Sequence, residues 1–309
     1  MKISIIGAGN VGSALAERVL AHNLADVVLV DAVEGTAEGK AIDLLDSSPI
    51  MGYEKGILGT ASYKEISGSE IIVITAGFPR RPGTSRDDLI RKNAAIIRSV
   101  TKNIKEFSPD SIIIVVTNPL DAMTCLAYRE MGCKRRKILG MAGTLDTARF
   151  KALLSQTLGM SPGKIEGFVL GSHGDTMVPL LSKTFVRGKL LGEALDRKKI
   201  DEIVERTKKR GGEIVGLLKS GSAYFSPSAA CFEILKVVIN DEKKVIPCSC
   251  ILEGEYGIKN CAIGVPARLG KDGVEEILEW KLPEEEIKAL RRSAGAVIAI
   301  LDKLQEREK

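Results

Sequence analysis

The sequence predicts an α/β protein with a doubly wound parallel sheet in its N-terminal half and a mixed α/β (α+β) domain in its C-terminal half. In the first half, short runs of isoleucine and valine alternate with helical patterns. Continuous apolar runs of this kind are typical of parallel strands buried on both faces. From about residue 144 the pattern changes, and shorter strand-like pieces and long helices follow. We therefore expect one domain over 1–143 and a second over 144–309.

The predicted elements follow this alternation in order. In the first half, strands are expected at 2–7, 27–31, 70–75 and 111–117, and helices at 11–22, 35–45, 88–106 and from about 121. In the second half, helices are expected at 144–158, 197–219 and 222–240, strand-like pieces at 164–170 and 183–191, a hairpin of 245–252 with 261–269, and a closing amphipathic helix.

Composition excludes several classes of protein. The chain has 309 residues, of which 44% are hydrophobic and 28% charged, which is typical of globular domains with real cores. No apolar run approaches the ~20 residues of a membrane helix, and no cleavable signal pattern opens the chain. The net charge of +5 comes from intermixed residues, unlike the basic stripe of a nucleic-acid surface. We expect a cytoplasmic protein. Two glutamines beside plentiful lysine and glutamate indicate heat adaptation.

The six cysteines are scattered without CxxC spacing, so a metal site is not expected, and the sequence leaves open whether any of them pair. Cys248 and Cys250 would share one face of a strand, because side chains alternate with period two. We interpret them as small core residues.

A glycine-rich turn follows the first predicted strand and opens the first helix. It reads Gly7-Ala8-Gly9-Asn10-Val11-Gly12, a GxGxxG pattern. Its glycines permit a tight turn and close approach of a pyrophosphate, and the helix N-terminus favours the phosphate charge. Asp31 ends the second strand, where a carboxylate accepts hydrogen bonds from the adenosine ribose and repels a 2′-phosphate. The sequence thus predicts a Rossmann domain that binds NAD rather than NADP.

Only two histidines are available for acid–base chemistry, His22 and His173. His22 ends the first predicted helix, where an imidazole interacts with the last carbonyls as a cap. His173 lies in LeuGlySerHisGlyAsp just past an apolar run, and it is either a general acid/base or a histidine in a turn.

The segment GTLDTARF at 143–150 places Asp146 and Arg149 on one face of a helix, because residues three apart are neighbours. A carboxylate can orient an imidazole and stabilise its protonated form, while an arginine can grip a carboxylate bidentately. The alternative is an ordinary surface ion pair.

A basic loop, AGFPRRPGTSRDDL at 76–89, follows the buried strand at 70–75. Its prolines and glycine exclude helix or strand interior. It carries Arg80, Arg81 and Arg86, and it is either a solvated turn or a lid that handles an anion.

Taken in order, GAGNVG, Asp31, AGFPRRPGTSRDDL, VTNPLD (116–121), LDTAR (145–149), GSHGD (171–175) and EGEYGIKN (253–260) resemble the lactate/malate dehydrogenase superfamily over almost the whole chain. The resemblance implies that His173 is the proton donor and acceptor, Asp146 its orienting partner, and Arg149 the clamp for the substrate's C1 carboxylate. Arg86 corresponds to the arginine that polarises the substrate carbonyl. The other implied contacts are Arg80, Asn118 and Ser222 for the substrate, and Gly7, Ala8, Gly9, Asn10, Val11, Gly12, Asp31, Asn93, Val116, Thr117 and Asn118 for NAD.

Arg80 stands where the family selects its substrate: the lactate enzymes carry glutamine and the malate enzymes arginine. A second carboxylate in a water-excluded site needs a cation, because an unpaired buried charge costs several kcal/mol. The resemblance therefore implies reversible hydride transfer between NADH and oxaloacetate, a step of the tricarboxylic acid cycle, in an enzyme of the lactate-dehydrogenase-like malate type. Arg81 is interpreted as solvent-facing, and Pro79, Pro82 and Gly83 as hinge residues.

The alternatives are a lactate or other 2-hydroxyacid dehydrogenase, a non-catalytic NAD sensor, and a metal-dependent NAD enzyme. Arg80 argues against the first. Retention of His173, Asp146, Arg149 and Arg86 argues against the second, and two histidines leave few ligands for the third. The family forms dimers and tetramers, and a tetramer built from dimers is favoured over a dimer because the chain lacks insertions.

Overall fold

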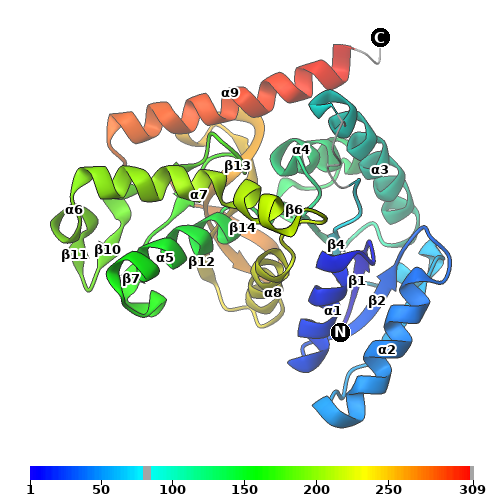
Figure 1. Cartoon of the computed structure of the whole chain (residues 1–309). Helices are drawn as coiled ribbons and strands as arrows, with labels where there is room; N and C mark the ends of the chain where they lie inside the picture. The colour runs from blue at the N-terminus through cyan, green and yellow to red at the C-terminus, as the bar shows by residue number, and fades with distance from the viewer. Residues whose placement is uncertain (79–84, 307–309) are drawn as a thin grey trace.

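The computed structural model describes residues 1–78 and 85–306, apart from the side chains of Arg86 and Glu306. A nine-stranded sheet with the order β14-β13-β12-β6-β5-β4-β1-β2-β3 runs through the chain (Figure 1). Its parallel part consists of β1 (Lys2–Ile6), β2 (Asp26–Val30), β3 (Ile57–Thr60), β4 (Ile71–Ile74), β5 (Ile112–Val115) and β6 (Ile138–Gly140). The order 3-2-1-4-5-6 is that of a dinucleotide-binding sheet, so the predicted doubly wound fold is confirmed.

The helices of this half are α1 (Asn10–Ala21), α2 (Thr36–Met51), α3 (Arg86–Phe107) and α4 (Leu120–Met131). Helix α2 is longer than predicted, because it continues through Pro49 to a left-handed end at Gly52. Helix α3 begins earlier than predicted, at Arg86, because Ser85 caps it by accepting a hydrogen bond from the Asp88 amide at 3.0 Å. His22 follows α1 as predicted, with Nδ1 2.9 Å from the carbonyl oxygen of Arg18.

The C-terminal half mixes short antiparallel strands with long helices. Its helices are α5 (Thr144–Leu158), α6 (Leu191–Ala194), α7 (Arg197–Leu218), α8 (Phe225–Ile239) and α9 (Glu284–Glu306). Its strands are β7 (Ile165–Glu166), β8 (Val169–Leu170), β9 (Val178–Pro179), β10 (Phe185–Val186), β11 (Lys189–Leu190), β12 (Lys244–Glu253), β13 (Lys259–Gly270) and β14 (Gly273–Ile277). Short 3-10 turns are η1 (Tyr63–Ile66), η2 (Arg135–Lys137), η3 (Pro162–Lys164), η4 (Leu181–Lys183) and η5 (Glu255–Gly257).

Two differences from the predicted strands stand out. The expected strand at 164–170 is two short strands, and β7 pairs with β10 whereas β8 pairs with β9. The predicted hairpin of β12 and β13 is present, but β12 also pairs antiparallel with β6, with Ser249 opposite Gly140. This pairing joins the two halves into one sheet, and it brings β12 beside the carboxyl end of the parallel strands.

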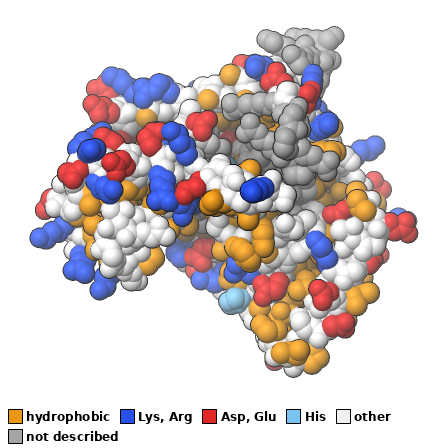
Figure 2. Space-filling model, in the orientation of Figure 1, with side chains coloured by type: hydrophobic (Ala, Val, Ile, Leu, Met, Phe, Trp, Pro, Cys, Tyr) orange, Lys and Arg blue, Asp and Glu red, His pale blue; other side chains and the backbone are white. Residues whose placement is uncertain are grey.

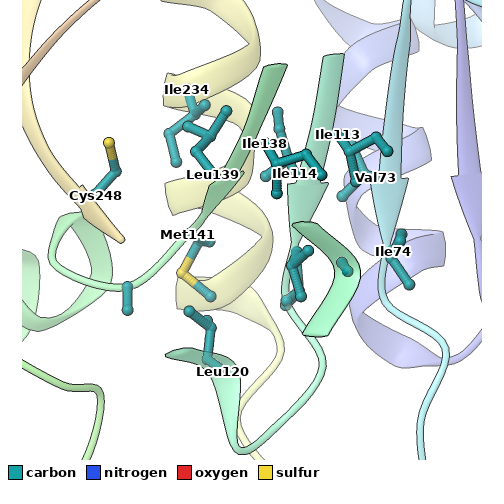
Figure 3. Close-up of a cluster of buried hydrophobic side chains, with 14 of the residues drawn as sticks. Val73, Ile74, Ile113, Ile114, Leu120, Ile138, Leu139, Met141, Ile234 and Cys248 are labelled. Atoms are coloured by element: carbon teal, nitrogen blue, oxygen red, sulfur yellow. The ribbon is translucent and has the colours of Figure 1, made fainter. Parts of the chain in front are cut away.

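The parallel strands and the helices enclose an apolar core. Figure 3 shows isoleucine, valine and leucine side chains of β4, β5 and β6 packed with Ile234 of α8 and Cys248 of β12. Cys248 and Cys250 are both buried, with their sulfur atoms 3.6 Å apart, so they are core residues of one strand face. The core thereby extends from one half of the chain into the other.

The final helix, α9, crosses the top of the molecule and reaches from the C-terminal half to the neighbourhood of α3 (Figure 1). It buries Leu290, Ala294, Val297 and Leu301. Acidic residues at its first turn face the positive end of the helix dipole. None of the helices in the described part of the chain combines the length and the apolar character that crossing a bilayer would need.

Candidate active site

The GxGxxG turn joins β1 to α1 next to β4, where the strand order reverses direction. Gly7 has φ +108°, and a Cβ on it would lie 2.5 Å from the backbone nitrogen of Ala76. A Cβ on Gly12 would lie 1.9 Å from the carbonyl oxygen of Gly7. At Gly9 a Cβ would meet no described atom within 4 Å. The outer two glycines are therefore required by packing, whereas Gly9 leaves the space that a pyrophosphate would fill at the start of α1.

Asp31, at the end of β2, lies directly beside this turn. Its carboxylate accepts hydrogen bonds from the amides of Ala8 at 2.7 Å and Val33 at 3.0 Å. The ammonium group of Lys40, on α2, donates to the carbonyl oxygen of Ala8. A carboxylate in this position could accept hydrogen bonds from the hydroxyl groups of an adenosine ribose. Lys40 is a cation that the sequence prediction did not anticipate, because α2 brings it back to the turn only through the fold.

Hydrogen bonds join the loop after β4 to the loop after β5. Asn93, buried on α3, accepts a hydrogen bond from the Phe78 amide at 2.7 Å and donates to the Asn118 carbonyl oxygen at 2.7 Å. Thr117 donates to the Ala76 carbonyl oxygen at 2.6 Å. These bonds fix the carboxyl edge of the sheet, where the predicted contacts Val116, Thr117 and Asn118 lie next to one another.

His173 lies in a loop that is held from two sides. Gly171 exchanges two backbone hydrogen bonds with Gly264 of β13, at 2.9 and 2.8 Å. It has φ +80°, and a Cβ would lie 2.8 Å from Oγ of Ser293, so glycine is required there. Ser293, buried on α9, also accepts a hydrogen bond from the Ser172 amide at 2.7 Å. The backbone next to His173 is therefore rigidly placed by β13 and α9.

The imidazole of His173 contacts the carboxylate of Asp146 on α5. Nδ1 lies 2.9 Å from Oδ2 and 3.0 Å from Oδ1, and the two side chains are 15% and 2% exposed. Burial alone would lower the pKa of His173, but the charge of Asp146 and its hydrogen bond raise it above the ordinary value. Burial would raise the pKa of Asp146, but the charge of His173 and the hydrogen bond to it hold that pKa below the usual range. With Nδ1 engaged, Nε2 is the ring nitrogen left for a substrate.

Arg149 lies one turn along α5 from Asp146, as its spacing predicted. Its Nη1 is 3.9 Å from Oδ1 of Asp146, and its side chain is 10% exposed. Within the described part of the chain, its Nε is buried and has no hydrogen-bond partner. Burial and the neighbouring charge of Arg210 lower the pKa of Arg149. A buried, unsatisfied guanidinium nitrogen beside an imidazole is a place where a carboxylate can bind.

Asp121 is a buried carboxylate of this cluster that sequence reasoning did not single out. It lies in the first turn of α4, and its Oδ2 accepts a hydrogen bond from the His173 amide at 2.6 Å. Its Oδ1 accepts one from Oγ of Ser249 on β12 at 2.7 Å. Burial raises the pKa of Asp121 to about 6, although both hydrogen bonds oppose the shift. Its place in VTNPLD was visible in the sequence, but its contacts to a loop and a strand far along the chain were not.

Several predicted substrate residues are not placed against this cluster by the structure. Arg80, Arg81, Pro82 and Gly83, like Pro79, lie outside the described residues, and Arg86 is described only as the first residue of α3. Ser222 lies exposed in the connection between α7 and α8. Among the described residues, no group of three or more histidine, cysteine or acidic side chains is arranged to hold a metal ion.

The sheet order and the glycine turn define a Rossmann-type dinucleotide-binding protein, with a histidine–aspartate pair at the carboxyl end of its strands. Two family models match the chain: "lactate/malate dehydrogenase, NAD binding domain" over residues 1–140 and "lactate/malate dehydrogenase, alpha/beta C-terminal domain" over residues 143–308. The chain belongs to the lactate/malate dehydrogenase family, and is thus an NAD-dependent oxidoreductase.

Individual relatives agree with this assignment. The chain is 50% identical to a malate dehydrogenase of Staphylococcus carnosus over 96% of both chains, and 46% identical to one of Bacillus israeli over 98% of both. It superposes on malate dehydrogenase of Salinibacter ruber with a TM-score of 0.94, at 44% identity over 99% of this chain and 98% of that one. It also superposes on a Cryptosporidium parvum lactate dehydrogenase bound to lactic acid and NAD, with a TM-score of 0.95, at 39% identity over 98% of both chains. Backbone similarity alone therefore does not separate the two substrates.

Proposed function

We propose that the chain catalyses the reversible reduction of oxaloacetate to (S)-malate with NADH. The observation that carries this proposal is the buried pair of His173 and Asp146 beside Arg149, whose Nε has no partner among the described residues. The relatives of 46–50% identity over nearly the whole chain, which are malate dehydrogenases, support malate over lactate.

In this reaction each side chain of the cluster has a separate task. Arg149 binds the carboxylate next to the reacting carbon, so that the carbonyl oxygen comes within reach of Nε2 of His173. Asp146 holds the other ring nitrogen and stabilises the imidazolium, so His173 donates its proton to the oxygen during reduction and takes it back during oxidation. Bound NADH supplies the hydride.

The loop residues complete the proposed substrate site. Arg80 pairs with the second carboxylate and excludes the neutral methyl group of pyruvate, which would leave the guanidinium unpaired. Arg86 stabilises negative charge on the reacting oxygen. Asn118 and Ser222 are proposed as further substrate contacts on the family resemblance.

For the cofactor, we assign the pyrophosphate to residues 7–12 and the adenosine ribose to Asp31. The nicotinamide side is assigned to Val116, Thr117 and Asn118, with Asn93 fixing that edge through its hydrogen bonds. Residues 1–143 then form the NAD-binding domain, and residues 144–309 the catalytic and assembly domain.

We further propose a homo-oligomer in the cytoplasm, with a tetramer built from dimers favoured over a dimer. In the orientation of Figure 1, where α2 lies at the lower right, Figure 2 shows apolar (orange) atoms on that part of the surface. Support comes from the exposed apolar side chains of α2. They are Ile42, Leu45, Ile50 and Met51, which are 60%, 52%, 86% and 54% exposed. Clusters of exposed apolar side chains often mark protein interfaces.

An assay of NADH loss with oxaloacetate tests the reaction, run with and without a chelator and with His173→Asn. Turnover that is insensitive to the chelator and falls in the variant by roughly 10²–10⁴-fold supports acid–base catalysis by His173. Absence of turnover in the wild-type protein would instead favour the NAD sensor, and loss with the chelator a metal-dependent enzyme.

A further inference from the structure

The carboxylate of Asp121 joins three segments that are far apart in the sequence. It lies on the first turn of α4, binds the backbone of His173 after β8, and accepts the hydroxyl hydrogen of Ser249 on β12. Asp121 is only 3% exposed. Any tilt of α4 or β12 would therefore move the backbone that carries the imidazole.

A neutral acceptor could make the same two hydrogen bonds at a lower desolvation cost, because burying a carboxylate is more costly than burying an amide. We therefore ask what the negative charge of Asp121 does for the neighbouring imidazole of His173. The described charges that act on the imidazole are those of Asp146 and Arg149 from α5 and Asp121 from α4. Arg149 opposes a positive imidazole, and the two carboxylates favour it. Protonated His173 and Arg149 together balance Asp146 and Asp121, whereas neutral His173 leaves one negative charge in excess.

We propose that Asp121 is a positioning residue that holds the backbone of His173 and serves as a second buried anion stabilising the protonated imidazole. This inference rests on the proposed role of His173 in proton transfer. The positive charge of Arg149, whose Nη1 lies 3.9 Å from Oδ1 of Asp146, counteracts the stabilisation that Asp146 gives to the protonated imidazole. Asp121, which lies on α4 rather than on α5, offsets that charge.

Three substitutions separate the two parts of this role. Asp121→Asn keeps an acceptor for the His173 amide but removes the charge. Asp121→Ala removes both. Ser249→Ala keeps the charge but removes one of its hydrogen bonds, which makes ionisation of Asp121 harder. Asp26→Asn is the matched control, because Asp26 also accepts a backbone hydrogen bond, from Gly56 at 2.9 Å, but lies on exposed surface at the start of β2.

The direct test is an NMR titration of the histidine rings in the substrate-free protein. The chain has two histidines, so His22→Gln assigns the remaining signal to His173. We expect Asp121→Asn to lower the pKa of His173, and the acidic limb of kcat/KM for malate oxidation to move to lower pH with it. Asp26→Asn should change neither. For Asp121→Ala we expect kcat/KM to fall by about ten-fold or more, as for the loss of a hydrogen bond to a charged group.

An unchanged His173 titration in Asp121→Asn would overturn the electrostatic part, even if the variant lost activity for structural reasons. An Asp121→Ala variant that is folded and as active as Asp26→Asn would overturn the positioning part. Because the titration uses neither substrate nor turnover, its result stands apart from the outcome of the oxaloacetate assay.

Discussion

Nδ1 of His173 lies 2.9 Å from Oδ2 of Asp146, and the two residues come from different elements, a loop after β8 and the first turn of α5. The carboxylate is nearly inaccessible to water, so its attraction for the imidazolium is little screened. The contact explains why the pKa of His173 rises although burial opposes the rise. It also leaves Nε2 as the single ring nitrogen that can serve a substrate.

Replacing Asp146 by asparagine should remove this attraction while keeping the shape of the side chain. We expect kcat/KM for oxaloacetate to fall by roughly 10²–10⁴-fold, because the imidazole loses both its orienting partner and the stabilisation of its charged form. Asp201→Asn, at an exposed ion pair of α7, is the control and should be near wild type. Comparable kinetics in the two variants would mean that Asp146 does not orient His173.

The pH dependence should have opposite signs in the two directions of the reaction. Malate oxidation needs neutral His173, so its kcat/KM should fall as pH falls through the pKa of His173, which lies above the ordinary 6.5. Oxaloacetate reduction needs the protonated form, so its kcat/KM should fall as pH rises through the same pKa. Steady-state profiles of both directions check this. If kcat/KM fell toward the same end of the pH range in both directions, a single group could not be the carrier of the proton.

Arg149→Lys keeps the positive charge but loses the planar fork that binds a carboxylate through two parallel hydrogen bonds. We expect kcat/KM to fall by about 10–100-fold, as for the loss of one charge-assisted hydrogen bond. The matched control is Arg206→Lys, at a pair with Glu213 where the arginine side chain is 54% exposed. Equal kinetics in the two lysine variants would show that Arg149 does not clamp the substrate.

Asp31→Ser should relax the preference for NAD over NADP. The carboxylate beside the Ala8 amide would repel a 2′-phosphate, and serine removes that repulsion while Lys40 remains at the same turn. We expect KM for NADH to rise and the ratio of kcat/KM values for NADPH over NADH to increase by at least ten-fold. Asp26→Ser, at a residue with no contact to the GxGxxG turn among its described hydrogen bonds, should leave the ratio unchanged. A ratio that did not move in Asp31→Ser would place the ribose elsewhere.

Local patterns predicted the parts of this molecule that depend on neighbours in sequence. The GxGxxG turn, the buried strands and the shared face of Asp146 and Arg149 follow from chain geometry, and each is found as expected. The pairing of His173 with Asp146 was implied by the family resemblance and not by the spacing of the two residues, and the structure brings them into contact.

What the sequence did not predict depends on tertiary contacts. Strands β3, β6, β9 and β14 were not predicted. Strand β3 is a partly exposed edge of four residues, β6 and β9 have only three and two residues, and β14 is the opposite edge of the sheet. The antiparallel junction of β6 with β12 leaves no local signal. Asp121 and Lys40 were missed for the same reason, since their partners lie 52 and 32 residues away in the chain.

The most direct measurement of the proposed function is the ratio of kcat/KM for oxaloacetate over pyruvate, with NADH, in the wild-type protein and in Arg80→Gln. The wild-type ratio should exceed about 10³, because an unpaired buried charge costs several kcal/mol. In Arg80→Gln the ratio should collapse by orders of magnitude, through loss of oxaloacetate turnover and gain of pyruvate turnover. A wild-type enzyme that reduces pyruvate as well as oxaloacetate, or an Arg80→Gln variant with an unchanged ratio, would contradict the assignment.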